Sequence, residues 1–216
     1  MIVNYLKTNP QDQNLLVVWN TENDMISKFG LKEELISIAW EVTDSRLFGT
    51  LVIRVPETGP QVKQIITFFI NEKGVIKKHD TIDDNSSEAL FAIQSPNIVS
   101  IAFNTNSKQE KINYILREIP MKEFSGVAAT DSLSISSIIN FNYHLTNGNM
   151  EEAYKAIKHI NSTEIWKNMA EMSIKMKRID VAETCFSNMK FARGAKAIRE
   201  MDQQGADKDA KIASVA

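Results

Sequence analysis

The stretch GNMEEAYKAI, residues 148–157, returns about 29 residues later as KRIDVAETCF, residues 177–186. In this alignment Met150 falls on Ile179, Ala153 on Ala182 and Ile157 on Phe186. Internal repeats with periods of roughly 20–50 residues are typical of solenoids, whose units bury their apolar faces only by stacking on neighbours. The repeat therefore predicts a helical repeat array in the C-terminal part of the chain.

Apolar residues follow a helical period from about residue 131 onward. The pattern predicts helices over residues 131–145, 150–160, 162–177, 178–189 and 190–202, joined by short turns. The second repeat unit also fits the tetratricopeptide (TPR) pattern, with small residues where helices approach and aromatic residues between hairpins. The predicted packing residues are Trp166, Met169, Ala170, Ala182, Phe186, Ala153 and Ile157. Two amphipathic hairpins in another helical domain are the alternative, and the short period and Ser173, where a Tyr is common, depart from the standard repeat.

The first half of the chain has a different pattern. Short runs rich in Val, Ile, Phe and Thr, separated by Asn, Asp, Gly and Pro, predict β-strands. The runs cover residues 15–19, 35–40, 46–55, 64–70, 74–82, 89–93 and 97–103. Trp19-Asn20 is close to the Trp-Asp dipeptide of WD-type propeller blades, where the aromatic residue packs between blades. An antiparallel sheet of another β fold is the alternative, and this half is too short for the 4–8 blades, each of roughly 40–45 residues, of a closed propeller.

The expected fold class is α+β with segregated halves, an incomplete WD40-type β-propeller region followed by TPR-like solenoid repeats. We expect a β-rich region over residues 1–118, interpreted as the terminal blades of a WD-type propeller, and a junction over residues 119–130. Helical hairpins follow over residues 131–202. Residues 203–216 form a tail or the truncated start of another helix. Both halves look incomplete, which suggests a fragment or short homologue of a larger protein.

Composition narrows the range of functions. The net charge of −2 and pI of about 6.0 give no basic field that would attract nucleic acid. No apolar run reaches the roughly 18 residues of a membrane span, and the N-terminus lacks the pattern of a signal peptide. The three histidines, with His79 expected in an exposed turn or strand edge, have no metal-ligand spacing. Cys185 is expected to be a packed residue, and nucleotide-binding and hydrolase motifs are absent, so we expect no catalysis, metal or cofactor.

Basic residues recur near the C-terminal end of the helical half. Lys190, Arg193, Lys196 and Arg199 are spaced three apart, which drifts slowly around a helix and forms a basic strip. The simplest interpretation is a solvated face. The alternative is a strip that faces an acidic surface of a partner protein.

Residues 119–202 resemble the intraflagellar transport protein 140 family. The similarity is strongest in GNMEEAYKAIK, IWKNMA, RIDVA and NMKFARGAKAIRE. The resemblance implies the end of the second of two WD-type propellers followed by the first TPR-like repeats. It also implies a subunit of intraflagellar transport complex A, with the other complex A subunits and cargo adaptors as partners. The implied location is the cilium or flagellum and the cytoplasm around the basal body.

Three functions thus follow from the sequence. The first is a non-catalytic scaffold in retrograde ciliary transport and in the trafficking of ciliary cargo and receptors. The second is a subunit of a vesicle coat, because coat subunits share the propeller-plus-solenoid plan. The third is a small enzyme with an unrecognised site.

Overall fold

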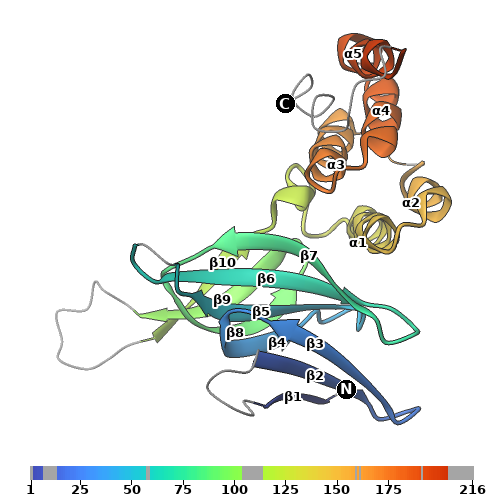
Figure 1. Ribbon diagram of the computed structural model, residues 1–216. Helices are drawn as coiled ribbons and strands as arrows, with labels where there is room; N and C mark the ends of the chain where they lie inside the picture. The colour runs from blue at the N-terminus through green and yellow to red at the C-terminus, as the bar shows by residue number, and fades with distance from the viewer. Residues whose placement is uncertain are drawn as a thin grey trace. The chain divides into compact units, whose positions relative to one another are not determined.

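The computed structural model describes residues 2–6, 14–56, 59–103, 114–158, 160, 162–190 and 192–203. The chain divides into two compact units, Met1–Ile119 and Pro120–Ala216. The first unit consists of β-strands and the second of helices (Figure 1). This layout agrees with the expected order of a β-rich half followed by a helical half.

The strands that the structure describes in the β unit form three sheets. The first sheet has the order β1-β2-β3, the second β4-β5-β6-β7 and the third β10-β9-β8. The strands are β1 (Ile2–Leu6), β2 (Asn14–Asn20), β3 (Met25–Leu31), β4 (Glu34–Trp40), β5 (Leu47–Arg54), β6 (Val62–Ile70), β7 (Ile76–Asp83), β8 (Ser87–Gln94), β9 (Asn97–Phe103) and β10 (Tyr114–Pro120). Sequential antiparallel pairing makes the second sheet a four-stranded meander.

The second sheet is buried on both faces along β5 and β6. Phe48 and Phe68 lie opposite each other on one face and belong to a core cluster that also contains Leu16 and Val18 of the first sheet. On the other face, a Cβ added at Gly49 would lie 3.0 Å from Cδ1 of Ile93 in the third sheet. The second sheet therefore lies between the other two, and this is why β5 and β6 are apolar at nearly every position.

The second and third sheets are also joined by polar contacts. The buried Glu41 carboxylate accepts hydrogen bonds from the backbone N–H of Ser95 at 3.0 Å and from its hydroxyl at 2.7 Å. The hydroxyl of Ser37 accepts from the backbone N–H of Leu90 at 2.8 Å. A buried polar group is costly unless it is paired, so these bonds fix the position of the third sheet against the second.

Apolar side chains are exposed on the outer sheets. On the first sheet they are Trp19 and Ile26, and on the third sheet they are Phe91, Phe103, Tyr114, Ile115 and Leu116. Trp19 was expected to pack between blades, but it is 38% exposed, and its Nε1 donates to Oδ1 of Asp24 at 2.8 Å. Trp40, by contrast, packs against Phe48 with ring centroids 4.8 Å apart.

Two features of the β unit differ from the sequence prediction. The strands β1, β3 and β10 were not predicted; β3 buries Ser27 and exposes Ile26, so its polarity hides the strand pattern. His79 was expected to be exposed, and this was wrong: it is only 8% exposed and lies 5.0 Å from the Phe69 ring. A register shift opposite Thr67 and Phe68 turns both His79 and Asp80 inward, and periodicity does not reveal such a bulge.

Within the described residues, the helical unit begins with a short 3₁₀ helix and continues with five α-helices. They are η1 (Lys122–Phe124), α1 (Ser132–Asn147), α2 (Met150–Ile157), α3 (Thr163–Lys175), α4 (Ile179–Asn188) and α5 (Ala192–Gln203). The side chains of Asp131, Asn149 and Ser162 accept backbone hydrogen bonds at the starts of α1, α2 and α3. Gly148, at φ 84°, ends α1 in the left-handed conformation that glycine adopts without strain.

Within this unit, α1 pairs with α2, α3 pairs with α4, and α5 packs on α4. The predicted tail beyond Gln203 lies outside the described residues. No helix in the described part of the chain is long and apolar enough to cross a membrane.

Candidate interaction surfaces of the helical unit

The seven predicted packing residues all lie in the interior of the helical unit. None of them has more than 7% of its surface exposed: Trp166, Met169, Ala170, Ala182, Phe186, Ala153 and Ile157. Trp166 is held in addition by a hydrogen bond, because its Nε1 donates to the carbonyl of Ile160 at 2.7 Å. This carbonyl lies in the connection between α2 and α3, so the indole ties the first hairpin to the second.

Two unusual residues in this interior are explained by their contacts. Ser173 is fully buried where the repeat pattern has Tyr, and its hydroxyl donates to the carbonyl of Met169 at 2.7 Å. A back-bond of this kind satisfies the hydroxyl within its own helix. Cys185 is 1% exposed, and burial raises the pKa of its thiol to about 12. At neutral pH it is a thiol, and the thiolate is the form that reacts or binds metals.

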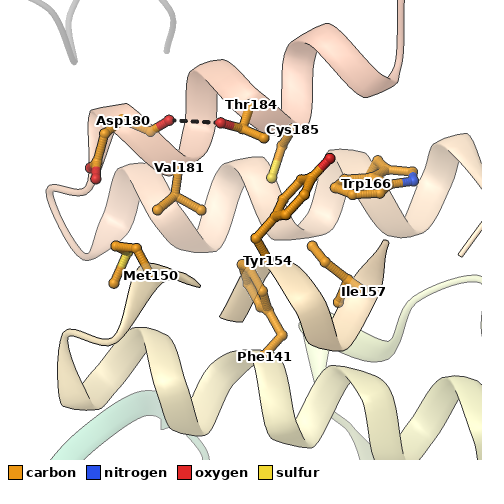
Figure 2. A pocket seen from close by; sticks show the side chains of 9 residues that line it. All are labelled: Phe141, Met150, Tyr154, Ile157, Trp166, Asp180, Val181, Thr184 and Cys185. Carbon is orange, nitrogen blue, oxygen red and sulfur yellow. Dashed lines mark hydrogen bonds between the residues drawn. The ribbon is translucent and has the colours of Figure 1, made fainter. Parts of the chain in front are cut away.

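A groove of about 350 Å³ lies between the two hairpins (Figure 2). Residues from α1, α2, α3 and α4 form the apolar groove, and most of them are apolar or aromatic. They are Phe141, Met150, Tyr154, Ile157, Trp166, Asp180, Val181, Thr184 and Cys185. Figure 2 shows the Tyr154 ring in the middle of the groove, and its side chain is among the exposed aromatic ones. The groove therefore offers apolar contact area to a partner.

Two polar groups of the apolar groove, on Asp180 and Thr184, are already hydrogen-bonded. Arg178 holds the Asp180 carboxylate through two hydrogen bonds, from Nε at 3.1 Å and from Nη2 at 2.8 Å, and these bonds lower the pKa of Asp180. The Thr184 hydroxyl donates to the carbonyl of Asp180 at 3.2 Å. This arrangement suits the packing of an apolar side chain, and it lacks the paired nucleophile and base that acyl transfer requires.

Sequence reasoning did not identify the apolar groove. In the repeat alignment Tyr154 falls on Glu183, so the pattern marks the position as variable and solvent-facing. The groove's three aromatic residues, Phe141, Tyr154 and Trp166, come from successive helices, and the way these helices cross is not encoded in the period. Tyr154 was the signal that could have indicated the groove, because large aromatic side chains are enriched in interfaces.

The four residues of the predicted basic strip are all exposed on or beside α5, and the structure separates them. Lys190, Lys196 and Arg199 line a hollow of about 500 Å³ together with Ser187 and Ala195. Arg193 does not line this basic hollow. Lys190 precedes α5 in a left-handed conformation, with φ of 56°, which is uncommon for a residue with a Cβ.

Within the described part of the chain, no three His, Cys, Asp or Glu side chains form a group that could hold a metal ion. His79 lies in the β unit, His144 lies in α1, and His159 lies outside the described residues.

The class of protein that this arrangement fits is a helical repeat scaffold, in which stacked hairpins present grooves and charged surfaces to other proteins. A comparison with known families agrees with this class. The family model for the TPR domain of intraflagellar transport proteins 140 and 172 matches residues 148–216. The helical part of the chain is thus similar to the TPR domains of intraflagellar transport proteins, and the match starts at the first copy of the repeat.

Proposed function

We propose that the chain is a non-catalytic scaffold segment of an intraflagellar transport complex A subunit. The observation that carries the proposal is the family match over residues 148–216, in the same hairpins that bury Trp166 and Ala182. The match covers the TPR domains of intraflagellar transport proteins 140 and 172 alike. The assignment to complex A, with its retrograde role, is supported by the sequence resemblance of residues 119–202 to the intraflagellar transport protein 140 family.

The β unit supports the same assignment. We infer that its sheets are blades of a WD-type propeller, because the second sheet is a four-stranded meander held between two neighbours. A blade of a propeller is covered on both faces. The exposed apolar residues on the outer sheets, Phe91 and Leu116 among them, are suited to contact with further blades. The proposed partners are therefore other complex A subunits and cargo adaptors, and the proposed location is the cilium with the basal body region.

The proposal includes the absence of catalysis. Cys185 is buried as a thiol, and the Asp180 carboxylate is engaged by Arg178. Turnover of a substrate by purified chain in hydrolase and transferase screens would contradict this part of the proposal.

The decisive experiment is affinity purification of the tagged chain from ciliated cells, followed by quantitative mass spectrometry. We expect the subunits of complex A to be enriched over those of complex B and over vesicle coat subunits. We also expect the tagged chain to appear in puncta along the axoneme. Enrichment of coat subunits with Golgi or endosomal puncta would favour the coat alternative, and enrichment of complex B alone would contradict the assignment to complex A.

A matched variant separates the contribution of the helical unit. Ala182→Asp places a charge at a fully buried position in α4, where a small residue lets two helices approach. We expect this variant to lose the co-purified subunits that the helical unit binds. Asn188→Asp, at an exposed position of the same helix that lines neither the apolar groove nor the hollow beside α5, is the control and should retain them.

A further inference from the structure

The basic hollow is a feature of the helical unit that repeat packing does not explain. Three of its five lining residues, Lys190, Lys196 and Arg199, carry positive charge. Helix faces that point to solvent normally mix positively and negatively charged side chains, because like charges placed close together repel each other. The convergence of three cations at the junction of α4 and α5 therefore needs a compensating negative charge.

The protein compensates this charge only in part. Arg199 Nε donates to Oε1 of Glu183 at 2.5 Å, and Lys196 Nζ lies 3.4 Å from Oε1 of Glu200. Within the described part of the chain, the Lys190 ammonium group makes no hydrogen bond or ion pair, and Glu183 accepts its hydrogen bond from the Nε of Arg199. The cations of the hollow thus already pair with the carboxylates of Glu183 and Glu200, and they retain N–H donors for further carboxylates. A guanidinium fork that uses one nitrogen can still bind a second carboxylate.

We propose that the basic hollow binds an acidic peptide segment of a partner protein. Its Glu or Asp side chains take the donors of Lys190 and Arg199, while its backbone lies along the gap between α4 and α5. The site deepens the scaffold function proposed above and rests on it for the expectation that the helical unit binds proteins. Arg193 has no part in the site, because it does not line the hollow.

A peptide fits this surface better than an anionic membrane does. Glu183 and Glu200 stand among the cations, and a flat anionic bilayer would be repelled by them, whereas a peptide can place its carboxylates between them. Membrane-surface helices also insert large apolar side chains. The described side chains of α4 and α5 expose none of these.

The test measures binding of fluorescein-labelled peptides to the purified full chain by fluorescence polarisation. One peptide alternates Glu with Ser, and its control has Gln in place of Glu. We expect binding of the Glu peptide only, with an affinity that falls as salt rises. The double variant Lys190→Gln/Arg199→Gln should weaken this binding about tenfold, since it removes the two charge-assisted contacts of the proposal.

Two further variants make the test specific. Arg193→Gln removes an exposed cation of the same helix outside the hollow and should leave binding unchanged. Glu183→Gln frees the whole Arg199 guanidinium group and should tighten binding about threefold. Equal losses in Arg193→Gln and the double variant, or absence of binding to the Glu peptide, would overturn the proposal. Preference for phosphatidylserine vesicles over the Glu peptide would also overturn it, in favour of a membrane site.

These outcomes are independent of the purification from ciliated cells. If the chain binds the Glu peptide but recovers no complex A subunits, the complex assignment fails and the site stands. A different result would refute only the peptide site. In that case the wild-type chain and the double variant both recover complex A subunits, but the Glu peptide does not bind, and the scaffold proposal is still supported.

Discussion

The central sheet of the β unit and the α3–α4 hairpin of the helical unit both pack around aromatic residues, but they assemble their cores in opposite ways. The core around Phe68 brings together residues from Leu16 to Ile76, which lie far apart in the sequence. In the α3–α4 hairpin the buried residues Trp166, Ala170, Ala182 and Phe186 all lie within two successive helices. Non-local cores form and fail together, whereas repeat arrays are stabilised by each unit and its neighbours. We therefore expect damage to spread through the β unit and to stay local in the helical unit.

The largest effect should come from Phe68→Ala. Phe68 is fully buried, stacks on Phe48 with centroids 5.3 Å apart and meets Phe29 edge-on at 5.1 Å. Truncation should destabilise the β unit by about 3–5 kcal/mol. Hydrogen-exchange mass spectrometry should show faster exchange in both the first and the second sheet, because the cluster joins them.

The control is Phe68→Leu, which keeps most of the apolar volume and should cost much less. Faster exchange confined to β6 in the Phe68→Ala variant would contradict a single core shared by the two sheets.

A smaller and more local effect is expected for Trp166→Ala. The variant loses the buried indole and its hydrogen bond to the Ile160 carbonyl, but the adjacent apolar groove allows some collapse. We expect a loss of about 3 kcal/mol, at the lower end for a truncated aromatic residue. Denaturant unfolding, together with hydrogen exchange restricted to α2, α3 and α4, would measure it.

Two variants sharpen this result. Trp166→Phe keeps an aromatic ring and loses the N–H donor, so it should cost about 1 kcal/mol, plus the penalty of an unpaired carbonyl where water does not replace the donor. Lys167→Ala, an exposed neighbour, should cost under about 0.5 kcal/mol. A Trp166→Ala variant that unfolds like the parent would refute the repeat register.

Gly148→Ala tests the turn between α1 and α2. An added Cβ would meet no atom within 4 Å, so the cost comes only from the left-handed φ of 84°. We expect a loss of about 1 kcal/mol, seen as a lower melting temperature of the helical unit. Gly148→Asn should lose less, because Asn tolerates this conformation better. Equal stability of the Ala variant would show that the turn relaxes.

The smallest effect should depend on pH and should appear in the β unit. Burial raises the pKa of Asp84, but hydrogen bonds from Ser86 and Ser87 and the Arg117 guanidinium group outweigh it, so the pKa lies below its ordinary value of 3.8. The contribution of this carboxylate is thus fully present above about pH 4 and is lost as the pH falls through the lowered pKa. Asp84→Asn should be less stable than the parent at neutral pH, and the difference should narrow below pH 4 in denaturant titrations. A constant difference would show that Asp84 does not titrate with folding.

The sequence predicted the helical unit more completely than the β unit, for a physical reason. The signals that predict a helix are local in the sequence. They are the apolar period and capping residues such as Asn149 and Ser162, and each depends on only a few neighbouring residues. The predicted helix ranges therefore agree closely with the helices in the described part of the chain. The apolar groove was missed because it depends on how helices cross, which the period does not specify.

The β unit shows what local patterns omit. The β5 and β6 runs were recognised because burial on both faces leaves them almost continuously apolar. The strand β3 was missed because Ser27 faces inward and Ile26 outward, and His79 was misplaced by a bulge. Such features are set by the neighbouring sheet rather than by the strand itself. The separation of Arg193 from Lys196 and Arg199 likewise depends on the position of α5 against α4.

The second sheet contacts its two neighbours through different kinds of interaction, and this difference has a mechanical consequence. Its contact with the first sheet rests on rings and aliphatic groups such as Leu16 and Phe29, whose hydrophobic attraction has no preferred direction. Its contact with the third sheet adds the short, directional bonds of Glu41 and Ser37. Under a shearing load, the contact between the first and second sheets should slip gradually. The contact between the second and third sheets should hold until its hydrogen bonds break together. When the molecule is pulled, the first sheet should therefore detach first, while the second and third sheets stay bound to each other.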